Sequence, residues 1–407
     1  MVGLIGLDPI STSYCSLAFK IERLFPGFVD AYYGPPGVKA MAEFGDAPEA
    51  AALVEQARTL ASAVADSDLE PSRKRFLGAQ VAAMVTTCRV LAGESLPYRD
   101  EVRGCLDVDA PRVPDAELDA ALVELDGLLP GDGSLGERMT AHRDRSTVDI
   151  PTARRMIDLL MAETRRRTEA IVDLPDRDEV VVEFVSDKPW SGYNWYLGGA
   201  RSRVEVNTDL PIHATRLPDL IAHEAYPGHH TEHALKDLGL FRGKGLGEHA
   251  IHLINTPECV ISEGIATLAA EMIFPGDEAI RWQAEVLLPE AGIDIDPELQ
   301  ARIDRASRPL RAVAGNAALL LHEEGRPERE VLDYLMHYEP ASEERARKRL
   351  SFLASPLWRP YIFTYSVGYD LLGAWVDAGG PGERHARFRR LLTQQVTPSE
   401  LAAATPA

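Results

Sequence analysis

The chain has 407 residues, of which 45% are hydrophobic and 26% are charged, a composition typical of a globular protein that buries a large core and can form two lobes. Its 63 acidic and 43 basic residues give a formal net charge of −20, which argues against nucleic acid and anionic membrane as main partners. This charge is compatible with peptide partners. The composition predicts no particular oligomeric state.

The N-terminal segment 1–9 has no basic region, and its apolar run is too short for a signal peptide. No stretch reaches the ~18–20 apolar residues of a membrane span. Four cysteines without CxxC spacing predict neither a disulfide framework nor a thiolate metal site: Cys15, Cys88, Cys105 and Cys259. Together these features predict a cytoplasmic protein.

Helical patterns dominate the first part of the chain. Apolar residues at helical spacing predict helices over 11–34, 46–66, 71–93 and 115–129, and Pro151 begins a long charged helix over 151–173. The run Pro130-Gly131-Asp132-Gly133 is a clear break before that last helix. We therefore predict an N-terminal helical lobe over 1–150 and a catalytic region over 151–407.

Strand-like patterns then interrupt the helices. Three short runs rich in β-branched and aromatic residues, separated by glycine-containing turns, predict an antiparallel meander: 180–185, 193–197 and 203–207. The last run could present an edge that pairs with an extended peptide, or it could simply cover the core. The predicted fold class is mainly α, with a small antiparallel β meander before a metal-binding helix.

Residues 223–230 read His-Glu-Ala-Tyr-Pro-Gly-His-His, and six of the eleven histidines fall between His223 and His252. A metal-binding imidazole followed at once by a carboxylate is typical of the helix that carries the zinc site of a peptidase. We predict one helix from about Leu217 to Leu238, ended by Gly239. Two of these six, His249 and His252, share one predicted helical face, and we expect a solvent-facing pair there rather than another partial metal site.

The spacing leaves the second histidine ligand open. In the usual motif the two histidines are four residues apart, but here the fourth residue after His223 is Pro227, which clashes with the carbonyl of His223 in a regular helix. If a bulge absorbs Pro227 and Gly228, His229 takes the ligand position. If the helix runs straight, His230 lies on the face of His223, about two turns away.

A second helix is predicted from Thr256, as cap, to about Phe274, where Pro275-Gly276 ends it. Glu263 lies among apolar residues of this helix, and a carboxylate is costly to bury there unless it is paired or metal-bound. Glu263 is therefore the predicted third ligand, with Glu258 and Glu271 as competitors. Two imidazoles and one carboxylate suit Zn²⁺ and leave one position open for water.

The motif segment resembles the bacterial family known as domain of unknown function 885, whose signature is His-Glu-x-x-Pro-Gly-His. Two later segments also resemble that family: Glu263-Gly264-Ile265-Ala266 and Tyr365-Ser366-Val367-Gly368. The resemblance covers roughly residues 180–375, and the chain departs from the family pattern at Ile265 and Leu268. It implies a zincin-like metallopeptidase in which His229, not His230, is the second ligand.

The predicted chemistry is zinc-dependent hydrolysis of amide bonds in short peptides. Zinc held by His223, His229 and Glu263 would lower the pKa of water from ~15.7 toward ~7. Glu224 would act as general base and then deliver the proton to the leaving amine. Tyr365 is the candidate donor to the oxyanion, supported by the resemblance, with Tyr369 and His337 as alternatives.

Two other functions stay open at this point. The same ligand set could hold non-haem iron or manganese in an enzyme that is not a peptidase, although Glu224 has a role in hydrolysis and none in oxygen activation. The chain could also be a catalytically inactive peptide-binding relative, against which the intact Glu224 argues. The sequence does not distinguish exopeptidase from endopeptidase action.

Overall fold

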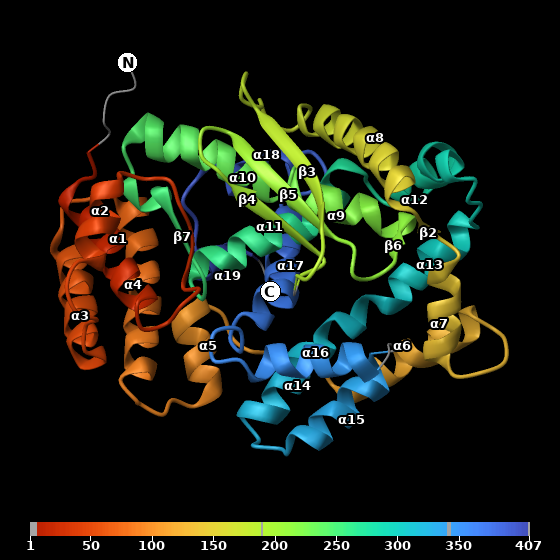
Figure 1. Ribbon diagram of the computed structural model, residues 1–407, viewed down its shortest axis with the longest axis horizontal. Coiled ribbons are helices and arrows are strands. Elements are labelled where there is room, and N and C mark those ends of the chain that lie inside the picture. Colours follow the sequence, from red (N-terminus) through yellow and green to blue (C-terminus); the bar gives the residue numbers. More distant parts are fainter. Residues whose placement is uncertain (1–5, 189, 340–342, 406–407) are drawn as a thin grey trace.

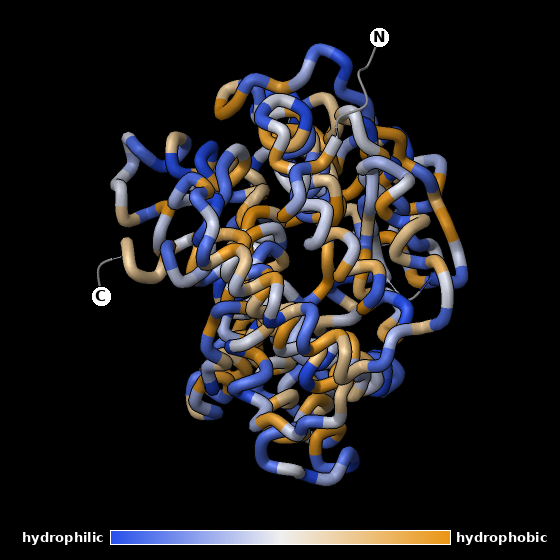
Figure 2. The backbone as a smooth tube through the Cα atoms, turned by 90° about the vertical axis from the view of Figure 1, so that its left-hand side faces the viewer, coloured by the Kyte–Doolittle hydropathy of each residue, from blue (hydrophilic) through white to orange (hydrophobic). Residues whose placement is uncertain are grey.

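We describe the fold from a computed structural model, in which residues 6–188, 190–339 and 343–405 are described. The architecture is mainly α with small β elements, which confirms the predicted fold class (Figure 1). Hydrophobic stretches gather toward the interior, and hydrophilic stretches dominate several of the outer turns (Figure 2). No single helix of the described residues is long and apolar enough to cross a membrane, although one bent pair, Pro257–Ile273 with Glu278–Ala291, passes by length and composition.

The N-terminal helices pack on one another at one side of the molecule (Figure 1): α1 (Pro9–Glu22), α2 (Pro36–Glu43), α3 (Ala50–Asp66) and α4 (Pro71–Leu91). The helix predicted over 11–34 is thus too long, because the chain leaves it at Glu22 and forms strand β1 (Val29–Tyr32). Strand β1 pairs antiparallel with β7 (Ile251–Leu253), and apolar side chains of β7 complete the N-terminal core. The first helices are therefore joined directly to the histidine-rich region.

Other hydrophobic cores are shared across residue 150. Helix α5 (Tyr98–Leu106) packs with α14 (Val313–His322), α15 (Glu328–Tyr338) and α16 (Glu343–Ala354). Helix α6 (Asp115–Leu128) packs with α13 (Pro297–Ser307). Helix α7 spans Leu135–Asp144. Helices before and after residue 150 therefore bury the same apolar surfaces, and the cores do not divide there.

A three-stranded sheet has the order β3 (Glu179–Val185), β5 (Arg201–Asn207), β4 (Gly192–Tyr196). Strand β4 runs antiparallel to β5, but β3 runs parallel to it, so the predicted meander is wrong in this pairing. Strands β4 and β5 are joined by a tight turn, in which Gly198 and Gly199 have φ of +81° and +65°, a region that glycine enters readily. Strand β5 is central, so residues 203–207 are not an edge.

Helices α8 (Ile150–Thr168), α9 (Leu217–Glu224), α10 (His229–Lys236) and α11 (Pro257–Ile273) lie beside this sheet (Figure 1). The C-terminal part adds α17 (Ile362–Asp377), α18 (Arg384–Thr393) and α19 (Pro398–Ala404). Two short strands, β2 (Thr147–Val148) and β6 (Ile212–His213), pair with each other. The remaining helical turns are η1 (Ala214–Arg216), η2 (Asp237–Arg242), η3 (Gly247–Ala250), α12 (Glu278–Trp282), η4 (Gln283–Leu287), η5 (Leu288–Ala291) and η6 (Arg308–Ala312).

Helices α11 and α17 cross at two glycines. A Cβ on Gly264 would lie 2.8 Å from the carbonyl oxygen of Gly368, and a Cβ on Gly368 would lie 2.7 Å from that of Val260. Both distances are shorter than real Cβ contacts, so only glycine permits this approach. The Glu263-Gly264 and Tyr365–Gly368 segments, far apart in sequence, are thereby held against each other.

Candidate metal centre

The segment that joins α9 to α10 brings two histidines together. Helix α9 ends at Glu224 and α10 begins at His229, so the single helix predicted over 217–238 is wrong. Pro227, after a cis Tyr226-Pro227 peptide bond, cannot continue α9 because it lacks an N–H group. Gly239 does not end α10 either, since helical turns continue to Arg242 in η2.

Gly228 makes this break possible. Its N–H donates to the carbonyl of Ala222 at 2.9 Å, and a Cβ at this position would lie only 1.9 Å from the carbonyl oxygen of His223. No other residue fits so close to the backbone of α9. The chain folds back on itself here, and the ring centroids of His223 and His229 lie 4.8 Å apart.

Glu263 of α11 faces both histidines. Its Oε2 lies 3.6 Å from His223 Nε2, and its Oε1 lies 3.8 Å from His229 Nε2. The residue is only 6% exposed, and its Oε2 has no hydrogen-bond partner among the described residues. The three predicted ligands therefore lie close together, each histidine beside a different oxygen of Glu263, and Oε2 is left without a hydrogen-bond partner among the described residues.

These residues fit a zinc ion. Ligand bonds of about 2.0–2.2 Å in a tetrahedral site put two ligand atoms roughly 3.3–3.6 Å apart, close to the two distances to Glu263. Burial, with the nearby His229, holds the pKa of His223 well below its usual range, so this imidazole is neutral, the form that binds metal. Burial also raises the pKa of Glu263. A cation would compensate the cost of burying the Glu263 carboxylate, and the neutral His223 could bind it.

Glu224 lies at the same point. His223, Glu224 and His229 each offer one possible ligand atom, and these three atoms lie within 4.8 Å of one another. Burial raises the pKa of Glu224 to about 7, with a further contribution from Glu263, while His229 opposes this rise. A carboxyl group with a pKa near neutrality suits a general base.

Strand β4 lies directly against Glu224. Asn194 Nδ2 donates to the Glu224 carbonyl at 2.7 Å and so holds the end of α9. A Cβ on Gly192 would lie 3.4 Å from Glu224 Oε1, and 2.4 Å from a methyl group of Leu220. The absence of a side chain at Gly192 therefore lets the edge strand approach the carboxylate.

Two tyrosines of the α17 region lie over Glu263. The Tyr361 hydroxyl donates to Glu263 Oε1 at 2.7 Å, and the ring of Tyr365 lies 5.7 Å from that of Tyr361. Tyr365 keeps 38% of its surface exposed. The surrounding protein raises its pKa well above the usual range, and the charges of Glu263 and Glu224 add to this. Its hydroxyl is therefore protonated and can donate.

Sequence reasoning missed Tyr361. The only signal for it was its spacing of four residues from Tyr365, which puts both on one helical face. The two alternatives to Tyr365 are engaged elsewhere: the Tyr369 hydroxyl donates to Glu271 at 2.7 Å, and His337 is a surface side chain, 63% exposed, 4.0 Å from Asp119. The competitor Glu258 forms an ion pair with the buried Lys236 at 3.4 Å.

His230 points away from Glu263. Its Nδ1 lies 2.7 Å from Ser202 Oγ, and its Nε2 contacts Asp178. Asp178 also accepts a hydrogen bond from the Tyr226 hydroxyl at 2.7 Å and forms an ion pair with Arg165. Both ring nitrogens of His230 are therefore occupied, and this framework anchors the turn between α9 and α10.

His229 has an outer partner that the sequence did not reveal. Its Nδ1 lies 3.1 Å from Ser262 Oγ, which donates to Glu232 at 2.5 Å. Lys236 donates to the other oxygen of Glu232 at 2.7 Å. A hydrogen bond at Nδ1 fixes the ring and leaves Nε2 facing Glu263. Glu232 also lies close to His229 and His233, but the Ser262 hydroxyl and the Lys236 ammonium already satisfy its two oxygens.

The prediction that His249 and His252 form a solvent-facing pair is wrong. His249 lies in η3 and is 2% exposed, whereas His252 lies in β7, and its ring stands 4.1 Å from that of His233.

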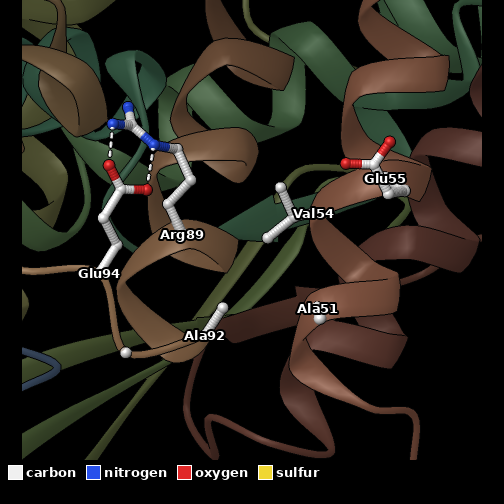
Figure 3. Close-up of a pocket in the computed structure, with 7 residues that line it drawn as sticks. Ala51, Val54, Glu55, Arg89, Ala92 and Glu94 are labelled. Carbon is white, nitrogen blue, oxygen red and sulfur yellow. Dashed lines mark hydrogen bonds and ion pairs between the residues drawn. The ribbon is translucent and has the colours of Figure 1, made fainter.

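A surface hollow lies elsewhere, between α3 and α4 (Figure 3). It is lined by the ion pair of Arg89 and Glu94 and contains none of the predicted site residues.

No protein-family model matches the chain, and no curated protein matches it. Two solved structures have a similar fold. "The putative lipoprotein from Colwellia psychrerythraea" superposes with a TM-score of 0.51 and 17% identity, over 86% of this chain and 65% of that chain. "A putative lipoprotein of unknown function from Shewanella oneidensis" superposes with a TM-score of 0.50 and 13% identity, over 97% of this chain and 82% of that one. The chain thus spans 65% of the length of the Colwellia protein, and at these identities the likeness concerns the fold alone.

Proposed function

We propose that the protein is a zinc-dependent hydrolase that cleaves amide bonds of short peptides. The observation that carries this proposal is Glu263, a buried carboxylate whose Oε2 has no hydrogen bond among the described residues and faces His223. Such a group is costly to bury, and a zinc ion shared with His223 and His229 would satisfy it. The resemblance to the domain of unknown function 885 family supports the same ligand set.

Zinc in such a site supplies a Lewis acid that acidifies water and polarises a carbonyl group. The remaining roles belong to the chain. Glu224 takes the proton of the attacking water and passes it to the leaving amine, for which a pKa of about 7 is suited. Tyr365 donates its hydroxyl proton in a hydrogen bond to the developing oxyanion. Tyr361 holds Glu263 in place through Oε1.

Strand β4 is the proposed place for an extended substrate. Backbone hydrogen bonds from Leu197 to Arg201 and from Asn207 to Ser191 fix the register with β5. By this two-residue period, the backbone groups of Gly192 and Asn194 face away from β5. Among the described residues no strand pairs with that edge. A peptide added there would pass the Glu224 carboxylate.

The proposal includes a cytoplasmic location. The four cysteines are free and buried, as expected in a reducing compartment. The descriptions of the two structural neighbours as lipoproteins define the alternative, an exported protein. Fractionation of cells that express the native gene decides between the two.

The test uses wild type and Glu224→Gln, each loaded with zinc and offered a mixture of short peptides. We expect cleavage by wild type and a loss of about 10³-fold or more in the variant, with zinc retained, because the base is lost and the ligands are not. The exposed Glu117→Gln on α6 is the matched control. Equal activity of wild type and Glu224→Gln would refute the mechanism. Iron or manganese instead of zinc in wild type purified without added metal would favour the non-peptidase enzyme, and zinc-loaded protein without any cleavage would favour an inactive peptide-binding relative.

A further inference from the structure

Strand β1 carries a carboxylate toward the metal centre. In its pairing with β7, Val29 stands opposite Leu253 and Ala31 opposite His252, so Asp30 is an extra residue at a β-bulge. A bulge redirects a side chain out of the regular alternation of the strand. Here it brings the Asp30 carboxylate to the hydroxyl of Tyr193 on β4, which donates to Oδ1.

Asp30 has no compensating cation. In the described part of the chain, its Oδ2 accepts no hydrogen bond and no Lys, Arg or His forms an ion pair with it. The residue is only partly exposed. Most other carboxylates around the histidine cluster are engaged: Glu232 with Lys236, Glu258 with Lys236 and Asp178 with Arg165. Asp30 is therefore a negative charge with one oxygen available to a ligand.

Asp30 is joined to the metal centre through Tyr193, which stands between Gly192 and Asn194, the two residues of β4 that lie against Glu224. A row of rings also runs from the metal centre to Tyr33, three residues after Asp30. The ring of His229 lies 5.7 Å from that of His233, which lies 4.1 Å from His252, which lies 5.5 Å from Tyr33. The side chains of His229 and His233 are 14% and 15% exposed, so the row borders solvent.

We propose that Asp30 binds a cationic group of the substrate, an ammonium or guanidinium group carried near the scissile bond. This inference rests on the proposed function and adds the substrate class. A partly buried carboxylate forms strong charge-assisted hydrogen bonds with such groups. The shared chemistry has two sources, the free N-terminus of a peptide or a Lys or Arg side chain.

The test compares three tetrapeptide amides: Ala-Ala-Ala-Ala with a free N-terminus, its N-acetylated form, and acetyl-Ala-Lys-Ala-Ala. We measure kcat/KM with zinc-loaded wild type, and binding by calorimetry to zinc-loaded Glu224→Gln and to the Glu224→Gln, Asp30→Asn double variant. Wild type is expected to prefer at least one cationic peptide by about 10- to 100-fold, the size of one hydrogen bond between charged groups. Preference for the first peptide identifies an N-terminal ammonium subsite, and preference for the third identifies a basic side-chain subsite.

Asp30→Asn should abolish this preference, so that kcat/KM for the cationic peptides falls to about that for the acetylated tetra-alanine. Tyr193→Phe tests whether Asp30 serves only to anchor β4 through the Tyr193 hydroxyl. In that case Asp30→Asn and Tyr193→Phe would lower kcat/KM by the same factor for all three peptides, and this result would overturn the inference. The exposed Asp46→Asn in the same lobe is the charge-matched control. Equal cleavage or equal binding of all three peptides by wild type and Glu224→Gln would also overturn it. Absence of zinc would instead mark failure of the proposed function, and the calorimetry on zinc-free protein would still decide the preference.

Discussion

His229 and His230 are neighbours in sequence and lie in opposite surroundings. His230 is fully buried with both ring nitrogens in contact, with Ser202 and Asp178. Among the described residues, His229 has a hydrogen-bond partner only at Nδ1, while its Nε2 faces Glu263 at 3.8 Å, beyond hydrogen-bond distance. The first environment is complete without a ligand, and the second is complete only with one.

This difference separates framework from function. Buried polar groups are normally satisfied, so the groups that are not satisfied indicate where a ligand binds. The framework around Asp178 holds the turn between α9 and α10, and the turn presents His229. Stability should therefore depend on the His230 side and metal binding on the His229 side. Substitutions on the two sides should therefore have different effects on unfolding and on zinc binding.

Gly228→Ala should remove both properties together. Its Cβ would lie 1.9 Å from the carbonyl oxygen of His223, so the turn cannot form without movement of the backbone. We expect a loss of about 4 kcal/mol or more in the free energy of unfolding, measured in urea, and no bound zinc. Gly239→Ala is the control, because a Cβ there meets nothing within 4 Å. Similar values for the two variants would contradict the role of the turn.

Asp178→Asn should lower stability without removing the metal site. The Asp178 side chain is fully buried and pairs with His230 and Arg165, and loss of one partner in a buried network costs about 3–5 kcal/mol. Unfolding is measured in EDTA, and zinc content is measured separately in the absence of denaturant. The exposed Asp176→Asn should be neutral. Loss of zinc from folded Asp178→Asn would join the two regions that we separate.

Ser262→Ala should weaken zinc binding with little effect on unfolding. The Ser262 hydroxyl orients the His229 ring, and loss of such an outer partner lowers metal affinity by about 10- to 100-fold. Competition with a chelating dye measures the affinity, and Ser262→Thr should restore it. An unchanged affinity in Ser262→Ala would show that the ring needs no such support.

The pH dependence of the metal-free protein should have opposite signs in the two regions. The pKa of Glu224 rises from 4.5 to about 7 on folding, so its contribution to stability is present below about pH 4.5 and is lost as pH rises to about 7. Glu224→Gln should therefore be more stable than wild type by about 3 kcal/mol at about pH 8, since each pKa unit corresponds to about 1.4 kcal/mol, and the gain should shrink toward about pH 5.

Asp178 behaves in the opposite way. Burial opposes its ionisation, but the hydrogen bonds from His230 and Tyr226 outweigh burial and lower its pKa. Its stabilisation is present above the ordinary pKa of an aspartate and is lost as pH falls. The free energy of unfolding of Glu224→Gln and Asp178→Asn is measured in urea and EDTA, from below the ordinary pKa of an aspartate up to about pH 8. A stability gain of Glu224→Gln that does not change with pH would contradict the assigned pKa.

The sequence predicted the elements better than their arrangement. Helices α3, α4, α6 and α11 were predicted to within a few residues because their apolar periodicity and proline or glycine ends are local. The three strands were also located, but the parallel pairing of β3 with β5 depends on tertiary contacts that no local pattern reports.

The same limit applies to the site. The predicted ligands and Glu224 do meet, because the motif is short and Pro227 forces the break between the two histidines. Tyr361 and Ser262 were missed since their roles arise from packing between helices. Asp30 comes from the first strand, and only the bulge against β7 brings it to Tyr193.

The central claim, that His229 binds metal and His230 does not, is tested most directly by zinc content. Wild type, His229→Ala and His230→Gln are purified without added metal and measured by inductively coupled plasma mass spectrometry, with circular dichroism to verify folding. We predict about one zinc per chain, as for a single three-residue site, in wild type and in His230→Gln, and none in His229→Ala. Zinc that is retained in His229→Ala and lost from folded His230→Gln would contradict the account.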